Sequence, residues 1–349
     1  MSFSTAFLKD LDIIKKNTIG LEDLENKTIL VTGATGQIGS FIVQSLSFIG
    51  SMKNLGLSII AVGRNEEKFS NKFSGILKNG NIKFVQQDFQ YELNWDFHTD
   101  YIIHAASNAD PKSYMSDPVG TMNGNYIATL NILNYAKEQN VEKVVFISTG
   151  EVYGEIDDTK PIDETTSGYI NSMKVRSCYP ISKRATETLC ISFMYQFGIE
   201  VSIARLAHIF GPNFSNKDSR VASQFLKSAS EGNDLTMYSE GKQIRSYTYI
   251  SDCVSGILTV LLRGENGEAY NVSNTENAIS LHDFCCYIAE LAGMQLKTVI
   301  ANEEEETLKT PISHAVLSNR KLKKLGWEPV INVKNGIKST LKILEGTNK

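Results

Sequence analysis

The sequence predicts an α/β protein in which a doubly wound parallel sheet is followed by a smaller C-terminal lobe. From residue 27 to about residue 205, short strands that are apolar throughout alternate with helical stretches. Strands of this kind are typical of a parallel sheet that helices cover on both faces. Beyond Leu206 the alternation ends, and residues 211–245 are rich in Gly, Ser, Asn and Lys. We therefore expect the C-terminal third to form a second lobe over the carboxyl edge of the sheet.

Each element has a local signature. Residues 3–16 carry Phe7, Leu8, Leu11 and Ile14 at helical spacing, which predicts a short amphipathic helix packed on the main body. The expected strands are residues 28–33, 57–63, 81–88, 100–106, 141–149 and 199–206, and the expected long helices lie near 118–139 and 180–197. Residues 278–349 are expected to hold two or three further helices.

Composition and charge exclude several classes of protein. Hydrophobic residues make up 42% and charged residues 21% of the 349-residue chain, as in an ordinary globular protein. The net charge of −4 provides no basic field for a nucleic acid or an anionic membrane. The five cysteines form no CxxC pair, the N-terminus has no basic-then-apolar leader, and the five histidines are scattered. We therefore expect a cytoplasmic protein with free thiols, no membrane association and no metal site.

A glycine-rich turn connects the first expected strand to its helix. It consists of Gly33-Ala34-Thr35-Gly36-Gln37-Ile38-Gly39. Glycines there permit a tight turn, close approach of the backbone to a pyrophosphate, and close packing of helix and strand. The helix N-terminus then presents free N–H groups and a partial positive charge to the phosphates. The sequence therefore predicts a Rossmann-type dinucleotide site with contacts from Gly33, Thr35, Gly36, Gln37, Ile38 and Gly39.

With a dinucleotide site at this position, we expect the chain to consist of three parts. Residues 1–26 are an N-terminal helical extension. Residues 27–205, together with about 246–275, are the dinucleotide-binding domain. Residues 206–245 and 276–349 are the substrate-binding lobe.

The end of the second strand bears on the choice of dinucleotide. An NAD site usually presents a carboxylate to the ribose hydroxyls about 20 residues beyond the glycine loop. Here Arg64 follows Gly63 instead, and a guanidinium would pair with a 2′-phosphate. We therefore expect NADP(H) to be favoured, with NAD(H) possible if Arg64 is only a solvent-exposed residue at a strand end. Asp88, which closes the third strand, is a candidate hydrogen-bond partner for the adenine amine.

Tyr179 and Lys183 lie four residues apart, and so on one face of a predicted helix. A free phenol has a pKa near ~10, which a nearby ammonium group and an oxidised nicotinamide would lower. The phenolate can then take the proton from a substrate hydroxyl while hydride leaves for the nicotinamide. The pair follows the glycine loop along the chain, with Ser148 and Thr149 between them at a strand end, and this order favours a catalytic reading.

Together these motifs resemble those of extended short-chain dehydrogenases/reductases that convert nucleotide sugars. GATGQIG, HAAS, STGEVYG, RSCYPISK, RLAHIFGP and RSYTYISD occur in the order found in sugar 4-epimerases, 4,6-dehydratases and UDP-glucuronate decarboxylases. The similarity spans roughly residues 27–330 and is greatest toward the decarboxylases. Their PxxYM and RSCY motifs look like Pro111-Lys112-Ser113-Tyr114-Met115 and Arg176-Ser177-Cys178-Tyr179.

The resemblance implies roles for the catalytic residues. Thr149 would hydrogen-bond the hydroxyl that is oxidised, Tyr179 would be the base, and Lys183 would serve both Tyr179 and the cofactor ribose. Glu151 matches an acidic residue above the sugar ring, unless it is a surface loop residue. The resemblance also implies a homodimer that pairs through the helices near 118–139 and 180–197.

Binding residues are implied in the same way. Arg245 matches an arginine placed on the diphosphate or the sugar, unless it pairs with Asp252 in a structural role. The implied cofactor contacts are Phe89, Ala105, Ala106, Asn125 and Lys183. The implied substrate contacts are Tyr114, Glu151, His208 and Arg245.

Four positions depart from the family pattern. Gly150 precedes Glu151 where dehydratases have an Asp-Glu pair, and since elimination of water needs an acid as well as a base, 4,6-dehydration is disfavoured. His208 replaces an asparagine that contacts the nucleotide sugar, which leaves the sugar and nucleotide open. Ala128 stands where a glycine is common, and Arg64 differs from the pattern of redox-neutral members, which hold NAD tightly.

Three functions compete. The leading one is an NAD(P)-dependent enzyme that oxidises a nucleotide sugar at C4, transforms the ketone as a decarboxylase or epimerase does, and returns the hydride. The second is a net NADPH-dependent reductase of a nucleotide-linked sugar, favoured by Arg64. The third is a non-catalytic dinucleotide-sensing protein. Intact Thr149, Tyr179 and Lys183 argue against the third, because a sensor needs no base.

Overall fold

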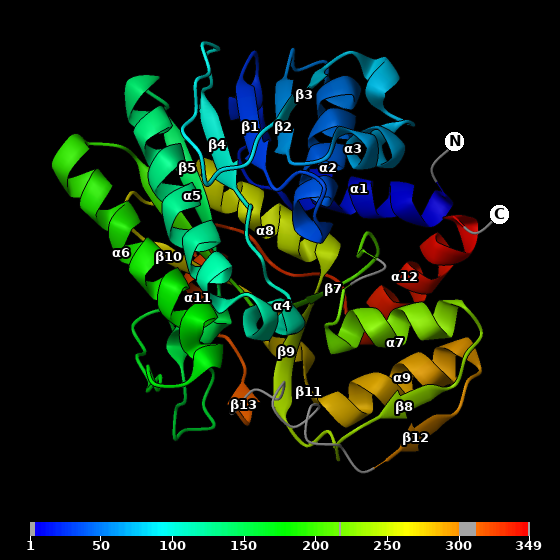
Figure 1. Ribbon diagram of the computed structural model, residues 1–349. Coiled ribbons are helices and arrows are strands. Elements are labelled where there is room, and N and C mark those ends of the chain that lie inside the picture. The colour runs from blue at the N-terminus through cyan, green and yellow to red at the C-terminus, as the bar shows by residue number, and fades with distance from the viewer. Residues whose placement is uncertain (1–3, 216–217, 300–311, 348–349) are drawn as a thin grey trace.

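Seven parallel strands form the sheet at the centre of the larger part of the molecule, in the order β10-β6-β5-β4-β1-β2-β3 (Figure 1). The computed structural model of the protein describes residues 4–215, 218–299 and 312–347. The strands of this sheet are β1 (Thr28–Thr32), β2 (Ser58–Gly63), β3 (Ile82–Gln86), β4 (Tyr101–His104), β5 (Lys143–Thr149), β6 (Val201–Leu206) and β10 (Ala269–Val272). Because β1 lies between β2 and β4, the direction of winding reverses there. Open α/β sheets bind ligands in the crevice that such a reversal leaves at the carboxyl ends of the strands.

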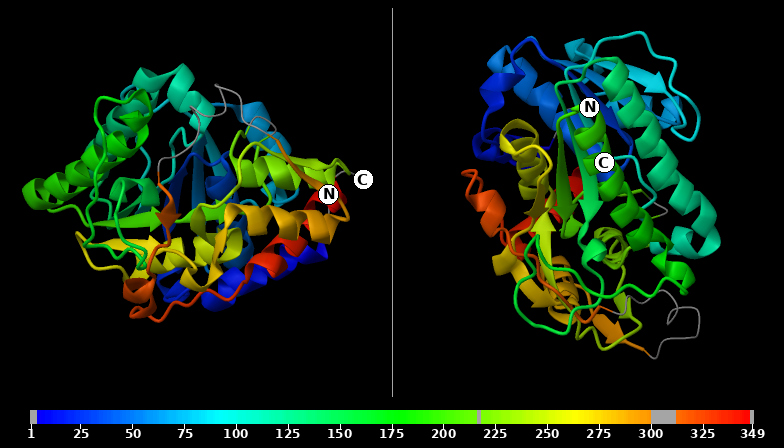
Figure 2. Two further views of the ribbon diagram at one scale, coloured as in Figure 1. Left: turned by 90° about the horizontal axis from the view of Figure 1, so that it is seen from below. Right: turned by 90° about the vertical axis from the view of Figure 1, so that its left-hand side faces the viewer.

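Helices cover both faces of this sheet (Figures 1 and 2). α2 (Gln37–Lys53) and α8 (Ile250–Arg263) pack on one face, and α5 (Pro118–Glu138) and α6 (Cys178–Phe197) pack side by side on the other. A separate apolar core lies on each side of the sheet as a result. The doubly wound α/β architecture predicted from the sequence is confirmed.

The other helices are shorter or lie in the second part of the molecule. They are α1 (Thr5–Asn17), α3 (Glu66–Phe73), α4 (Pro111–Ser116), α7 (Val221–Ser230), α9 (Leu281–Ala292), α11 (Arg320–Lys323) and α12 (Val333–Thr347), with 3-10 turns at Leu21–Leu24, Leu77–Asn79, Gly150–Tyr153, Val175–Ser177 and Thr275–Asn277. Within the described ranges, no helix has both the length and the apolar character needed to cross a membrane.

β10 is a strand that the sequence analysis did not identify. It pairs in parallel with β6 at one edge of the sheet. Asn271 interrupts its four residues, so the strand lacks the continuous apolar run that marked the other six. The side chain of Asn271 is buried with all of its polar atoms hydrogen-bonded. Its amide nitrogen donates to the carbonyl oxygens of Ile162 and Ser318, and its amide oxygen accepts from the Tyr153 hydroxyl.

α1 is the helix predicted from apolar spacing near the N-terminus, and it packs on α2, α8 and α12. Its buried apolar side chains are Phe7, Leu11 and Ile14. Leu8, which the same spacing assigned to the apolar stripe, is 40% exposed. Asp10 lies on the buried side, where it accepts a hydrogen bond of 2.6 Å from the hydroxyl of Tyr249.

A four-stranded sheet is the centre of the smaller part of the molecule, in the lower half of Figure 1. Its middle strand is β9 (Ile244–Tyr249), which pairs with β7 (His208–Phe210), β11 (Ala278–Ser280) and β13 (His314–Ala315). A separate parallel pair consists of β8 (Leu235–Met237) and β12 (Leu296–Thr298). The boundary expected near residue 246 therefore falls inside β9, which belongs wholly to the smaller sheet.

Candidate active site

The glycine-rich turn after β1 has the geometry that a pyrophosphate requires. Gly33 has φ +63°, and a Cβ there would lie 2.7 Å from the carbonyl oxygen of Ala105, so only glycine fits. A Cβ on Gly39 would overlap the carbonyl oxygen of Gly33, so the absence of a side chain lets α2 approach the turn. Gly36 differs from both, because its φ of −72° suits any residue and only the oxygen of Gly33 lies near its missing Cβ. The space above Gly36, at the N-terminus of α2, therefore fits a phosphate group.

Two further residues of this turn, Gln37 and Thr35, form hydrogen bonds with other parts of the protein. They do so through a side chain and a carbonyl oxygen, and not through the backbone N–H groups that would bind a phosphate. The side chain of Gln37 bonds to Gly211, Pro212 and Arg220. The carbonyl oxygen of Thr35 accepts a hydrogen bond of 3.4 Å from Lys72 Nζ, on α3. Their backbone N–H groups, with that of Ile38, lie at the start of α2 and are available to a ligand.

The residues expected at the adenosine end follow β2 and β3. Arg64 is exposed directly after β2, beside the start of α3. Asp88 follows β3, and its carboxylate accepts from the N–H of Gln90. Phe89 is buried, with its ring edge-on to Trp95. Arg64, Asp88 and Phe89 therefore follow two neighbouring strands of the sheet, and the side chain of Phe89 contributes packing.

The carboxyl end of β4 forms the opposite wall of the crevice. Ala106 N donates to the Thr32 hydroxyl, and this contact joins β4 to β1. Asn125 on α5 is 1% exposed and donates to the Ser182 hydroxyl at 2.9 Å. It therefore ties α5 to α6 one residue from Lys183, behind the predicted catalytic residues.

Tyr179 lies at the start of α6 and is 6% exposed. The ring of Tyr114 stacks on it with the centroids 4.5 Å apart. Burial, and secondly the charge of Glu151, raises the pKa of Tyr179 to about 12, against hydrogen bonding with Thr149 and Tyr114 and the charge of Arg220. The lowered phenol pKa expected from the sequence refers to the state with an oxidised nicotinamide beside the phenol, whereas in the chain by itself desolvation outweighs the stabilising contacts.

Lys183 lies one turn further along α6 and is 2% exposed. Its ammonium group donates to the carbonyl oxygen of Ile147 at 2.9 Å and lies over the ring of Phe146. Burial lowers the pKa of Lys183 to about 7, and Glu187 opposes this shift. His104 is hydrogen-bonded at both ring nitrogens, to Thr32 and Thr129, so its buried imidazole is held in place by packing and hydrogen bonds.

Glu151 forms a bidentate ion pair with Arg176, at 2.8 and 3.2 Å. Thr149 fixes the start of the turn that carries Glu151, because its hydroxyl accepts from the Glu151 N–H. Arg176 lies 6.0 Å from the ring centroid of Tyr114, and its buried Nε makes no hydrogen bond within the described residues. Glu151 is therefore a partly buried residue paired with Arg176, with its side chain 23% exposed.

Arg220 is a cation of the site that the sequence analysis missed. It pairs with Asp218 at 2.5 Å and acts electrostatically on Tyr114 and Tyr179. Desolvation, and then the charges of Arg245 and Arg220, lowers the pKa of His208. Its side chain is nevertheless exposed to solvent. No local pattern marks Arg220, because it lies in the Ser- and Asn-rich stretch after β7.

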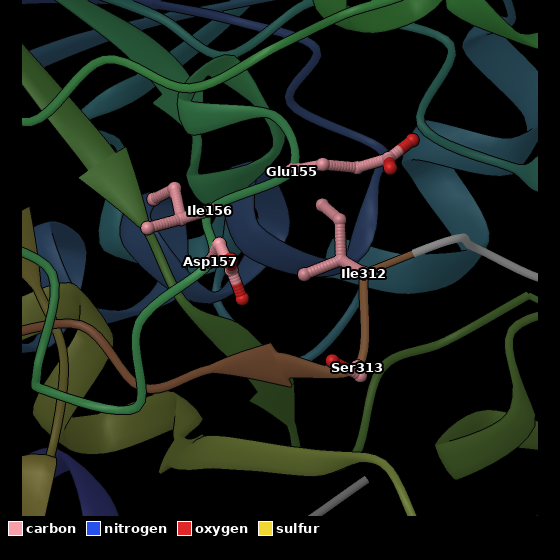
Figure 3. Close-up of a pocket in the computed structure, with 5 residues that line it drawn as sticks. All are labelled: Glu155, Ile156, Asp157, Ile312 and Ser313. Atoms are coloured by element: carbon pink, nitrogen blue, oxygen red, sulfur yellow. The ribbon is translucent and has the colours of Figure 1, made fainter.

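Arg245, on β9, is 3% exposed and donates to the carbonyl oxygens of Ile244, Ser313 and Ile312. The alternative pairing with Asp252 is not observed, since that carboxylate accepts from the N–H groups of Val330 and Ile331. A pocket beside Arg245 is lined by Glu155, Ile156, Asp157, Ile312 and Ser313, and Figure 3 shows Ile312 pointing across it toward the 155–157 segment.

The described residues therefore combine a glycine-rich turn after β1 with a buried tyrosine and lysine on α6 and three arginines. This combination is typical of NAD-dependent enzymes of the extended short-chain class. Within the described residues, no cluster of His, Cys, Asp or Glu is arranged to hold a metal ion.

Comparison with known proteins identifies the family. Residues 29–273 match the NAD dependent epimerase/dehydratase family, and the chain belongs to it. UDP-glucuronic acid decarboxylase 1 of Xenopus tropicalis is 32% identical over 330 residues, which cover 92% of this chain and 73% of the relative. UDP-glucuronic acid decarboxylase 6 of Arabidopsis thaliana is 32% identical over 314 residues, which cover 89% of this chain and 87% of that one. The predicted family and the NAD-dependent class of enzyme are confirmed.

Solved structures show the same fold. A UDP-glucose 4-epimerase with UDP-glucose from Thermotoga maritima superimposes with a TM-score of 0.77 at 24% identity, over 92% of this chain and 100% of that one. A UDP-glucuronic acid 4-epimerase from Bacillus cereus, in complex with UDP-glucuronic acid and NAD, has a TM-score of 0.77 at 22% identity, over 92% of this chain and 99% of that one. The predicted Rossmann-type fold is confirmed.

Proposed function

We propose that the protein oxidises a UDP-linked uronic acid at C4, releases its carboxylate as carbon dioxide and reduces the ketone again, with no net redox change. The observation that carries this proposal is the Arg176–Glu151 pair beside Tyr114 and Tyr179. The side chain of Arg176 is 16% exposed, and after its two bonds to Glu151 each terminal nitrogen keeps one N–H group that can hold a substrate carboxylate. The names of the two decarboxylase relatives support the same substrate.

Tyr179 takes the proton from the C4 hydroxyl in this proposal, and Thr149 orients that hydroxyl. NAD(P)⁺, when bound, supplies the hydride acceptor and a positive charge beside the phenol. Arg220 also favours the phenolate, since its charge already lowers the pKa of Tyr179 against the effect of burial. Lys183, whose Nζ donates to the carbonyl oxygen of Ile147, would bind the cofactor ribose and add its charge to the site of Tyr179.

The next step follows from the chemistry of a 4-ketone. A carboxylate on C5 is then β to a carbonyl group, so the bond between C5 and the carboxyl carbon breaks and its electron pair passes toward the C4 oxygen. Carbon dioxide leaves, C5 takes up a proton, and the ketone is reduced. No acid next to Glu151 is needed, which agrees with Gly150: a Cβ there would lie 3.1 Å from Leu317 Cδ1.

We further propose that NADP(H) binds more tightly than NAD(H). Arg64 is exposed where NAD sites present a carboxylate, and Lys72 places a second cation on Thr35 of the turn. A charge-assisted contact with a 2′-phosphate is worth about 1.5–3 kcal/mol. The Bacillus cereus structure was solved with NAD, so a preference for NADP(H) would distinguish this protein from that epimerase.

Titration of both dinucleotides into wild type and Arg64→Ala tests the cofactor preference. Arg64→Ala should weaken NADP(H) binding by about tenfold or more and leave NAD(H) binding nearly unchanged. Lys53→Ala, which removes an exposed cation at the far end of α2, is the control. Tighter binding of NAD(H) by wild type, with no change in Arg64→Ala, would reject the preference.

Incubation with UDP-glucuronate and a panel of UDP-, CDP- and dTDP-sugars tests the reaction itself. We expect a pentose product and carbon dioxide from UDP-glucuronate, with cofactor needed only in catalytic amounts. Product mass is recorded together with absorbance at the reduced-nicotinamide band. A 4-keto-6-deoxy product would mean that the argument from Gly150 against dehydration is wrong.

The second candidate is a net NADPH-dependent reductase of a nucleotide-linked sugar, which Arg64 favours. The same assay separates the two, because a reductase consumes one NADPH for each product molecule. We weigh the decarboxylase motifs and the Arg176–Glu151 pair above the single arginine.

We also propose a homodimer and a cytoplasmic location. The outer face of α5 exposes Val119, Met122 and Tyr126 at helical spacing, which supports pairing of α5 and α6 with a second copy. All five cysteines are free thiols, which supports a reducing compartment. The division into a cofactor domain and a substrate lobe is part of the same proposal.

A further inference from the structure

Gln37 connects the start of the cofactor helix to the substrate side of the cleft. It is the first residue of α2, and its side chain is 9% exposed. Its Nε2 donates to the carbonyl oxygens of Gly211 at 3.0 Å and Pro212 at 3.3 Å. Its Oε1 accepts a hydrogen bond of 2.7 Å from Arg220. One neutral side chain therefore joins α2, the 211–213 turn and a buried guanidinium.

Two partners fix the guanidinium of Arg220. Asp218 accepts a hydrogen bond of 2.9 Å from the Nε of Arg220. It accepts a second one, of 2.5 Å, from Nη2, the terminal nitrogen that also donates to Gln37. The charge of Arg220 is felt by Tyr114, Tyr179 and His208. Asp218 compensates the charge of Arg220, and the amide oxygen of Gln37 is a second, neutral acceptor on one terminal nitrogen of the guanidinium.

Gln37 is not required to hold the 211–213 turn. The Asn213 amide donates to Gln44 Oε1 at 2.8 Å and to the Ser40 hydroxyl at 3.3 Å. Lys72 donates to the Asn213 carbonyl oxygen at 2.9 Å. The turn is thus anchored to α2 and α3 by other side chains, and among these anchors Gln37 alone reaches Arg220.

We propose that Gln37 is a positioning residue that orients Arg220 for an anionic group of the substrate, a phosphate of the nucleotide sugar. This rests on the proposed function only in taking the substrate to be such an anion. Because Gln37 also begins the helix that receives the cofactor phosphates, one residue aligns the two ligands. A rigid neighbour of this kind matters because an arginine loses binding energy when its donors are misdirected.

The test compares two glutamines of α2 that both bond to the 211–213 turn. Gln37→Met keeps the side-chain length and removes the contact with Arg220, whereas Gln44→Met removes a turn contact that does not involve Arg220. We measure UDP binding by calorimetry, and KM and kcat for UDP-glucuronate at saturating cofactor. We expect Gln37→Met to weaken UDP binding and raise KM by about tenfold, the scale of a hydrogen bond to a charged group. Gln44→Met should stay within twofold of wild type, with equal Tm for both variants.

A double-mutant cycle with Arg220→Met tests whether Gln37 affects UDP binding through Arg220. If Gln37 acts through Arg220, Gln37→Met adds nothing to UDP binding in the Arg220→Met background. Additive losses, equal effects of Gln37→Met and Gln44→Met, or a wild type that does not bind UDP would each overturn the inference. UDP binding that depends on Gln37, without turnover of UDP-glucuronate, would reject the proposed reaction and retain the role of Gln37.

Discussion

Tyr179 illustrates how single residues set the chemistry of the site. Its stack on Tyr114 excludes water from the phenol, and this desolvation raises its pKa to about 12. The base is therefore inactive until positive charge arrives beside it. This order suits a dehydrogenase, because proton removal is favoured only when the oxidised cofactor is in place.

Tyr179→Phe is expected to lower kcat for the sugar by at least ~10²-fold, the usual scale of general acid–base catalysis, since the ring remains packed while the ionisable oxygen is lost. Cofactor affinity should change little. Lys183→Met should weaken both, because its ammonium is proposed to serve the tyrosine and the ribose together. Steady-state rates and dinucleotide titration measure the two effects. A phenylalanine variant within a few-fold of wild type would mean that Tyr179 is not the base.

The catalytic candidates were predictable from the sequence because their spacing is local. Tyr179 and Lys183 share one helix, and Thr149 and Glu151 share the end of one strand. The arginines were not predictable in the same way. Arg176 meets Glu151 across 25 residues and Arg220 meets Gln37 across 183 residues, and no local periodicity reports such contacts.

At the scale of elements, strands that are apolar throughout were predictable and β10 was not. Its buried Asn271 depends on partners from two distant loops, which a window of neighbouring residues does not contain. α1 was predictable from its apolar stripe, yet the same stripe hid a charge. Asp10 is 2% exposed in the interface that α1 forms with β9 and α12.

Asp10 should make the docking of α1 depend on pH. Burial raises its pKa from 3.8 to about 7, against hydrogen bonds from Tyr249 and Ser339. The folded state therefore binds the proton more tightly than the unfolded state, so this stabilisation is complete below about pH 4 and is lost as the pH rises to 7. Asp10→Asn should raise stability at pH 8, by at most roughly 4 kcal/mol, relative to its effect at pH 4.

Thermal unfolding of wild type and variant between pH 4 and 8 measures this difference. Asp12→Asn is the matched control, since Asp12 lies on the exposed side of the same helix and pairs with Lys15 and Lys16. Parallel pH profiles for wild type and Asp10→Asn would show that Asp10 does not titrate in this range.

At the scale of the whole molecule, the two sheets meet along the cleft that holds the candidate residues. β7 and β9 of the smaller sheet bring His208 and Arg245 to it, while β5 and α6 of the larger sheet bring Thr149 and Tyr179. The 211–213 turn is bonded to α2 and α3 on the cofactor side. These bonds join residues that lie more than 100 positions apart in the chain, so no local pattern in the sequence predicts them.

α5 and α6 lie side by side on the outside of the large sheet, at the left of Figure 1. On α6, Ala185, Thr188, Ser192 and Tyr195 are exposed at helical spacing. The small side chains of Ala185, Thr188 and Ser192 allow another helix to approach closely, and Tyr195 adds apolar contact area. On α5, Met122 and Tyr126 are 42% and 40% exposed and provide apolar contact area. Two copies related by a twofold axis would bury both faces in a four-helix bundle.

Light scattering at micromolar concentration should therefore give the mass of a dimer. Met122→Glu places a charge in the proposed interface and should shift the protein toward the monomer, because an unpaired buried charge is strongly unfavourable. Met52→Glu is the matched control, since Met52 is 59% exposed on α2, a helix outside the proposed interface, and should leave the mass unchanged. A monomeric wild type, or a dimer that both substitutions leave intact, would place the contact elsewhere or exclude it. The active sites are expected to be complete within each copy, since the proposed catalytic residues and the arginines that surround them all come from one chain.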